Sequence, residues 1–159
     1  MQNKLPIIIR KLSQNDVIQI ADLNISIAKE TENIDLPKEK IQNGVQQMLD
    51  NPELGQYFVV EHEETQEIVA CFMNTYEWDE IKNGLIWWIQ SVYVKTQFRR
   101  KGVYSRMHNF LKELAIKNGA LGLKLYVEKK NYRAQQAYKK MGMIPSDTYF
   151  FEETFNKTN

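Results

Sequence analysis

Three consecutive cations, Arg99, Arg100 and Lys101, stand directly before Gly102. A strand-like pattern precedes them and a helical pattern follows. The N-terminus of a helix presents backbone N–H groups and the positive end of its dipole, which together favour anions. Gly102 has no Cβ, so the backbone there can approach a ligand closely. This segment therefore predicts a site for a phosphorylated ligand. From these residues alone, a solvated basic turn before a helix stays open as the alternative.

Other reactive side chains form no recognisable arrangement in the sequence. Cys71 lies within a strand pattern and is expected to be a small buried hydrophobe. His62 and His108 belong to no catalytic pattern. One Cys and two His cannot build a Cys/His zinc site, so we expect no metal. Tyr138 lies on the apolar face of a predicted helix, where a Tyr is most often a core residue.

Two segments of the chain carry spaced motifs. Arg99, Gly102 and Tyr104 fall on the three marked positions of the pattern R/Q-x-x-G-x-G/A, and residues 131–143 follow N-x-x-A-x-x-x-Y-x-x-x-G-F/M. With one helix and one strand between them, these motifs resemble those of the GNAT superfamily of acetyl-CoA-dependent N-acetyltransferases. Tyr104 departs from the small residue of the first pattern. Its backbone N–H can still face a phosphate, but its side chain must find room.

The resemblance implies that acetyl-CoA is the co-substrate. The main chain of Val92 and Val94, on the central strand, would bond the pantetheine arm and the thioester carbonyl. Asn131 would lie near the pantetheine arm, and it also suits the N-cap of the helix that follows it. The residues implied for the pyrophosphate are Arg99, Arg100, Lys101, Gly102, Val103 and Tyr104.

The resemblance also assigns acid and base roles. Tyr138 matches the family position that often acts as general acid toward the departing sulfur, and a phenol can donate a proton near neutral pH. The base is open, because the central strand offers Gln90 where some members have a carboxylate. Glu77 and Glu128 are candidates, and each is also an ordinary solvated acid. A water relay and an amine that arrives neutral are further alternatives.

Hydrophobic periodicity and turn residues give the element order βααβββαβαβ. Helices are predicted after a cap at 13–16, from Pro37, from Gly102 and after Asn131. In the first helix, Asn24 interrupts the apolar face. The predicted strands are 7–10, 56–61, 68–76, 85–95, 121–127 and 149–155. Together with this element order, the resemblance implies one GNAT-like α/β (α+β) domain over residues 1–159, a mixed, mostly antiparallel twisted sheet with helices on both faces.

Composition agrees with a single globular domain. The chain has 159 residues, of which 43% are hydrophobic and 26% charged. The start does not resemble a signal peptide, and no apolar stretch reaches the roughly 20 residues of a membrane span. We therefore expect a soluble cytoplasmic protein with no membrane partner. The sequence leaves the oligomeric state open, a homodimer included.

The net charge of +1 averages two opposed segments. Residues 30–80 hold 13 acids and 2 bases, and residues 95–140 hold 13 bases and 2 acids. The basic segment carries both motifs and suits an anionic cofactor. One hypothesis is that the acidic segment steers a cationic acceptor. The alternative is that charges segregated in sequence are interleaved in space.

The sequence therefore predicts an enzyme that transfers acetyl from acetyl-CoA directly to the primary amine of a small molecule or peptide. The alternative from another class is a catalytically silent acyl-CoA-binding sensor or interaction module on the same fold. Near-neutral charge argues against a nucleic-acid partner.

Overall fold

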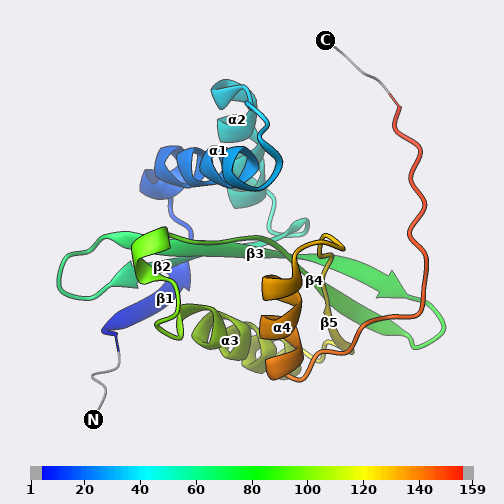
Figure 1. Cartoon of the computed structure of the whole chain (residues 1–159). Helices are drawn as coiled ribbons and strands as arrows, with labels where there is room; N and C mark the ends of the chain where they lie inside the picture. Colours follow the sequence, from blue (N-terminus) through cyan, green and yellow to red (C-terminus); the bar gives the residue numbers. More distant parts are fainter. Residues whose placement is uncertain (1–4, 156–159) are drawn as a thin grey trace. The chain divides into compact units, whose positions relative to one another are not determined.

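The computed structural model describes residues 5–155, and Figure 1 shows its elements. The strands are β1 (Ile7–Lys11), β2 (Gly55–His62), β3 (Ile68–Asp79), β4 (Gly84–Val94) and β5 (Gly122–Lys124). The helices are α1 (Val17–Glu32), α2 (Lys38–Asp50), α3 (Val103–Lys117) and α4 (Tyr132–Lys140), with 3-10 turns η1 (Gln14–Asp16) and η2 (Thr96–Phe98). The chain divides into two compact units after Tyr126.

The first unit is built on one sheet with the strand order β1-β2-β3-β4-β5. Neighbours from β1 to β4 are antiparallel, and β5 runs parallel to β4. The predicted mixed, mostly antiparallel sheet is therefore confirmed. The parallel pair follows from the crossover through α3, since a helix between two strands brings them side by side in the same direction.

Helices cover both faces of this sheet, with α1 and α2 on one face and α3 on the other (Figure 1). Side chains alternate along β2, so that Phe58 and Val60 pack in the cluster with α3 while Tyr57 and Val59 pack in the cluster with α1 and α2. The same alternation separates two tryptophans of β4. Trp87 is buried in the α3 cluster, and its neighbour Trp88 points to the other face.

β4 and β5 separate part-way along β4. Pairing between the two strands ends at Trp88 and Lys124. Beyond this point Ser91 adopts a φ of 50°, and the register with β3 shifts. Cys71 faces Tyr93 and Met73 faces Gln90, so two β4 residues, 91 and 92, oppose one residue of β3. This is a β-bulge, which bends a strand and re-aims its edge.

Two sets of part-buried polar contacts hold β1 and its flanks. Asp16 is 6% exposed and binds Arg10 through both carboxylate oxygens, at 2.8 and 3.0 Å. Burial by itself would raise the pKa of Asp16, but the hydrogen bonds from Arg10 and Ser13 outweigh it and lower the pKa to about 2. On the other face, Arg106 of α3 donates to the carbonyls of Leu5 and Ile7, at 2.7 and 2.5 Å.

Two predicted strands differ from the structure. The strand expected at 121–127 is hydrogen-bonded only over Gly122–Lys124, because β4 turns away at its bulge and leaves the following residues without a ladder. The strand expected at 149–155 does not form. Its aromatic residues have high strand propensity, but a strand also needs a hydrogen-bonding neighbour, and the described part of the second unit contains no other strand. Within residues 5–155, no helix has the length and apolar character needed to cross a membrane.

Candidate active site

The turn from β4 to α3 has the backbone of an anion site. Arg100 and Gly102 both have positive φ, 61° and 76°, and α3 begins at Val103. A Cβ built on Gly102 would meet nothing within 4 Å, so the space in front of this residue is open. Gly102 has no side chain that could cap α3, so the N–H groups of the first turn can donate to a ligand. The anion site at this turn stays a prediction, and this open backbone is compatible with it.

Arg99 does not project into this space as a free cation. Its guanidinium binds both carboxylate oxygens of Glu30 in α1, at 2.6 and 2.8 Å, and its Nε donates to the Val94 carbonyl at 2.8 Å. The Glu30 contact raises the pKa of Arg99 further. Arg99 therefore braces the turn against β4 and α1. The cations that stay exposed beside the helix end are Arg100 and Lys101, which make no ion pair among the described residues.

The outer edge of β4 is open where the strand approaches this turn. The amide of Lys95 donates to Val69 of β3 at 2.9 Å. Because successive residues of a strand alternate, the N–H and C=O of Val94 face the opposite edge. The Val94 carbonyl is used there by Arg99, and the bulge at 91–92 lies just before it. No strand of residues 5–155 covers this edge beyond Trp88.

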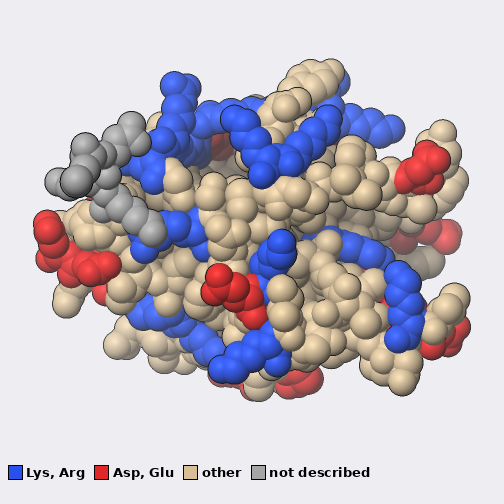
Figure 2. Space-filling view, turned by 90° about the horizontal axis from the view of Figure 1, so that it is seen from below, with Lys and Arg blue, Asp and Glu red and all other residues tan. Residues whose placement is uncertain are grey.

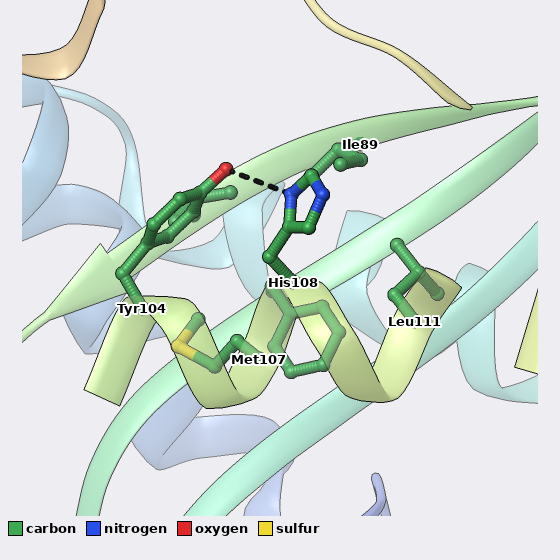
Figure 3. Close-up of a pocket in the computed structure, with 7 residues that line it drawn as sticks. Ile89, Tyr104, Met107, His108 and Leu111 are labelled. Carbon is green, nitrogen blue, oxygen red and sulfur yellow. Dashed lines mark hydrogen bonds between the residues drawn. The ribbon is translucent and has the colours of Figure 1, made fainter. Parts of the chain in front are cut away.

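The Tyr104 side chain lies along α3, pointing toward the next turn of the helix. Figure 3 shows its ring turned toward His108 one helical turn later, with its hydroxyl 3.5 Å from Nδ1. His108 is 4% exposed, and desolvation lowers the pKa of its imidazole. The two side chains line an apolar pocket with Val92, Ile89 and residues of α3. No motif in the sequence predicts this pair, and the i, i+4 spacing of Tyr104 and His108 is the available signal for it.

Glu77 lies at the other end of the open edge and is a poor candidate for a base. Its carboxylate accepts a hydrogen bond from the Trp88 indole and another from Lys124 at 3.2 Å. These two contacts lower the pKa of Glu77. The Trp88 ring also stacks on Tyr126, with centroids 4.4 Å apart. A carboxylate held in its charged form has little tendency to take a proton from an ammonium.

The second unit contains the later motif. Asn131 caps α4, and its side-chain oxygen accepts from the Ala134 amide at 3.1 Å, which confirms the predicted cap. Gly142, with a φ of 88°, ends the helix as predicted. Burial raises the pKa of the Tyr138 phenol, so this group holds its proton at neutral pH. The Glu128 side chain is exposed.

Charges that are segregated in the sequence are paired in the fold. Three ion pairs join the acidic segment 30–80 to the basic segment 95–140, and Figure 2 shows residues of both signs on one face. The pairs are Lys95–Glu67, Arg99–Glu30 and Lys124–Glu77. At these three places the two segments are interleaved, as the alternative to a steering acidic surface predicts.

The model of the Acetyltransferase (GNAT) family matches residues 18–143. The chain belongs to this family. The resemblance carried by residues 94–104 and 131–143 is therefore confirmed, and with it the predicted fold class. No curated protein matches the chain.

Solved structures agree with this assignment. A possible acetyltransferase from Clostridium difficile 630 is 36% identical, with a TM-score of 0.87 over 94% of this chain and 98% of that one. A predicted acetyltransferase with acetyl-CoA from Clostridium acetobutylicum is 18% identical, with a TM-score of 0.75 over 92% and 96%. AAC(6')-Iy in complex with the bisubstrate analogue CoA-S-monomethyl-acetylneamine is 11% identical, with a TM-score of 0.78 over 94% and 99%. The last two show a shared fold.

Proposed function

We propose that this GNAT protein transfers the acetyl group of acetyl-CoA directly to the primary amine of a small molecule. One observation carries the proposal: the open edge of β4 runs straight into a turn that presents Gly102, two exposed cations and the N-terminus of α3. An extended ligand with an anionic end matches such a strip. The family model spans both units, which supports one acetyltransferase domain over 1–159.

The residues present fit acetyl-CoA. The amides at the start of α3, with Arg100 and Lys101, would hold the pyrophosphate. The backbone of Val92 and Val94 would bond the pantetheine arm and the reacting carbonyl, and Asn131 would contribute a polar contact to that arm. Arg99 acts on this site through Val94 and Glu30, as a positioning residue.

Acetyl-CoA, when bound, supplies an acyl group activated as a thioester. The chain's own tasks are to orient the carbonyl, to stabilise the charge that develops on its oxygen and to protonate the departing sulfur. We propose that backbone N–H groups at the β4 bulge stabilise the negative charge that develops on the carbonyl oxygen. The protonated Tyr138 phenol would donate a proton to the departing sulfur. The lowered pKa of Glu77 favours Glu128, a water relay or an amine that arrives neutral over Glu77 as the base.

The small-molecule acceptor is supported by aminoglycoside acetyltransferases among the structural neighbours, one of which was solved with trehalose. Because the sequence identity of these neighbours is low, they show only a shared fold. The acceptor of this chain must therefore be identified by assay. A cytoplasmic location and a homodimer stay predictions.

A thiol-release assay with a panel of amines tests the proposed function. We expect CoA release that depends on one class of amine, and acetyl-CoA should raise the melting temperature. Tyr138→Phe should lower kcat at least about tenfold while the Kd for acetyl-CoA changes less than about twofold. If acetyl-CoA and CoA both leave the melting temperature unchanged, the cofactor assignment is wrong.

The second candidate is an acyl-CoA-binding sensor without turnover. It is favoured by Gln90, which stands on β4 where some family members carry a carboxylate and which donates to the Thr75 hydroxyl at 2.6 Å. Tight acetyl-CoA binding with no release on any amine would support this sensor over the enzyme.

A further inference from the structure

A small apolar pocket lies between β4 and α3, next to the bulge at residues 91–92. Most of its lining consists of hydrocarbon and thioether side chains from the core cluster on the α3 face of the sheet: Phe72, Ile89, Val92, Met107 and Leu111. The other two lining residues are Tyr104 and His108. A hollow of this composition suits a small hydrocarbon group, because a charged or strongly hydrated group would lose its water there.

The two polar residues of the pocket face each other. The Tyr104 hydroxyl lies 3.5 Å from Nδ1 of His108, and the ring centroids are 6.0 Å apart. Figure 3 shows the hydroxyl directed at the imidazole, and the imidazole extending from α3 toward Ile89 of β4. His108 is 4% exposed, and desolvation holds the pKa of its imidazole below the usual value, so the ring is neutral at pH 7. The pair therefore forms an uncharged wall of the pocket.

Tyr104 adds bulk that the motif does not require. The pattern R/Q-x-x-G-x-G/A has Gly or Ala at this position, and neither could reach His108 one turn later. The space left between the lining side chains has room for about one water-sized group. A methyl group is close to this size, whereas an ethyl or propyl group is longer. The Tyr104 and His108 rings thus restrict what the pocket can hold.

Val92 connects the pocket to the proposed reaction. Its side chain lines the pocket, and its backbone belongs to the bulge, on the stretch of β4 beyond the last pair with β5. In the proposed function this backbone bonds the pantetheine arm and the reacting carbonyl. A carbonyl held there would place the hydrocarbon end of its acyl group at the pocket.

We propose that this pocket receives the hydrocarbon end of the acyl group, and that Tyr104 and His108 limit the acyl group to acetyl. The inference rests on the proposed acetyl transfer and deepens it, since it names the class of acyl-CoA that the site takes. The two side chains act through their volume. One extra methylene in an apolar pocket changes discrimination between substrates by about 10–200-fold, so propionyl-CoA and butyryl-CoA should be disfavoured.

The test compares the Kd of acetyl-CoA with that of butyryl-CoA by isothermal titration calorimetry. Both ligands carry the same CoA, so a change at the anion-binding turn cancels in the ratio of the two Kd values. We expect wild type to bind acetyl-CoA at least about tenfold more tightly. Tyr104→Ala should reduce this ratio to less than about threefold, because loss of the ring opens the wall. Tyr104→Phe is the matched control, and it should keep the ratio within about twofold of wild type, since it removes only the hydroxyl.

A second variant acts at a distance from the turn before α3. His108→Ala also enlarges the pocket and should reduce the ratio in the same way, so it provides the test if Tyr104→Ala folds poorly. Leu114→Ala is its control, because Leu114 packs in the same core cluster but lies outside the pocket lining. A general loosening of α3 would appear in this control, whose ratio should stay within about twofold of wild type.

The outcomes are distinguishable. The proposal is overturned by a wild-type ratio near or below one, by wild-type ratios in both Tyr104→Ala and His108→Ala, or by an equal shift in Leu114→Ala. Loss of the ratio in Tyr104→Phe overturns the claim that volume decides. A wild-type protein that binds acetyl-CoA but releases no CoA on any amine refutes the proposed function, and the Kd ratios then still decide the role of the pocket.

Discussion

The two ends of the open β4 edge each carry a cluster of one cation, one carboxylate and one aromatic ring. At one end, Arg99 binds Glu30 and lies 5.5 Å from the ring of Tyr93. At the other, Lys124 binds Glu77 and lies 5.5 Å from the ring of Trp88. Each cluster thus joins a cation of the basic segment to a carboxylate of the acidic segment beside an aromatic ring.

The clusters differ in how firmly they are held. The Arg99 side chain is 24% exposed and also donates to the Val94 carbonyl, whereas the Lys124 side chain is 46% exposed. Arginine offers a planar fork that can bind a carboxylate and a carbonyl at once, and lysine is a single point charge. The same pairing therefore braces a turn in one place and remains a solvated surface contact in the other.

A third pair, Arg10 with Asp16, extends the comparison to a nearly buried carboxylate, and we expect the largest effect there. Asp16→Asn should lower the free energy of unfolding by about 2 kcal/mol at pH 7, because the folded pKa of Asp16 is about 2 against 3.8 unfolded. A lowered pKa gives stability that is present above pH 4 and lost as pH falls through 2. Urea unfolding from pH 7 to 2 should therefore show this loss in wild type and not in the variant.

The matched control for this pair is Asp22→Asn. Asp22 binds Lys38 at 2.8 Å, but both side chains are at least half exposed. Such a pair contributes less than about 1 kcal/mol. An equal loss of stability in both variants would contradict the burial argument.

Arg99 should give the next largest effect. Arg99→Ala removes the contacts with Glu30 and the Val94 carbonyl, so the turn before α3 loses its brace, and the Kd for acetyl-CoA should rise about tenfold. Arg99→Lys should restore little of the affinity for acetyl-CoA, since one ammonium cannot make all the contacts of the planar guanidinium. Isothermal titration calorimetry measures both. Full rescue by lysine would mean that only the charge matters at this position.

Lys101 should act by charge alone. Lys101→Gln should raise the Kd for acetyl-CoA about threefold at low salt, and the difference should shrink as salt is added. Lys117→Gln, at the opposite end of α3, is the control and should change the Kd little. Equal effects of the two variants would place the anion away from the turn.

Glu77 should give the smallest effect. Glu77→Gln keeps an acceptor for the Trp88 indole and removes only the charge, so kcat should change less than about twofold. The pH profile of kcat/KM should keep its shape. A large loss of kcat together with loss of the acidic limb of that profile would identify Glu77 as the base after all.

Much of the fold could be predicted from local signals. Gly102 and Asn131 mark the starts of α3 and α4 because caps depend on a few adjacent residues, and the alternation of Trp87 and Trp88 depends only on strand geometry. The prediction of an anion site at the turn before α3 rests on the same kind of local signal.

The errors and omissions concern contacts between distant residues. Arg99 was predicted on the pyrophosphate, which stays a prediction, and the motif could not show that its guanidinium is held by Glu30, 69 positions away in the sequence. Asn24 is explained by Tyr57, 33 positions later, and the bulge at Ser91 follows from the register of β3 against β4. Residues 149–155 have strand propensity without a partner strand. None of these features is visible in a local window.

The hydrogen bonds from Arg106 to the carbonyls of Leu5 and Ile7 set an order on folding. They join residues 101 and 99 positions apart, so the contacts of β1 are among the longest in the chain. At a synthesis rate of about 5–20 residues per second, β1 is synthesised roughly 5–20 seconds before Arg106. Closing so long a loop is slow compared with forming a helix. The Arg106 contacts of β1 can therefore form only after its pairing with β2 is available, and variants of Arg106 should show their effect in the yield of folded protein during synthesis.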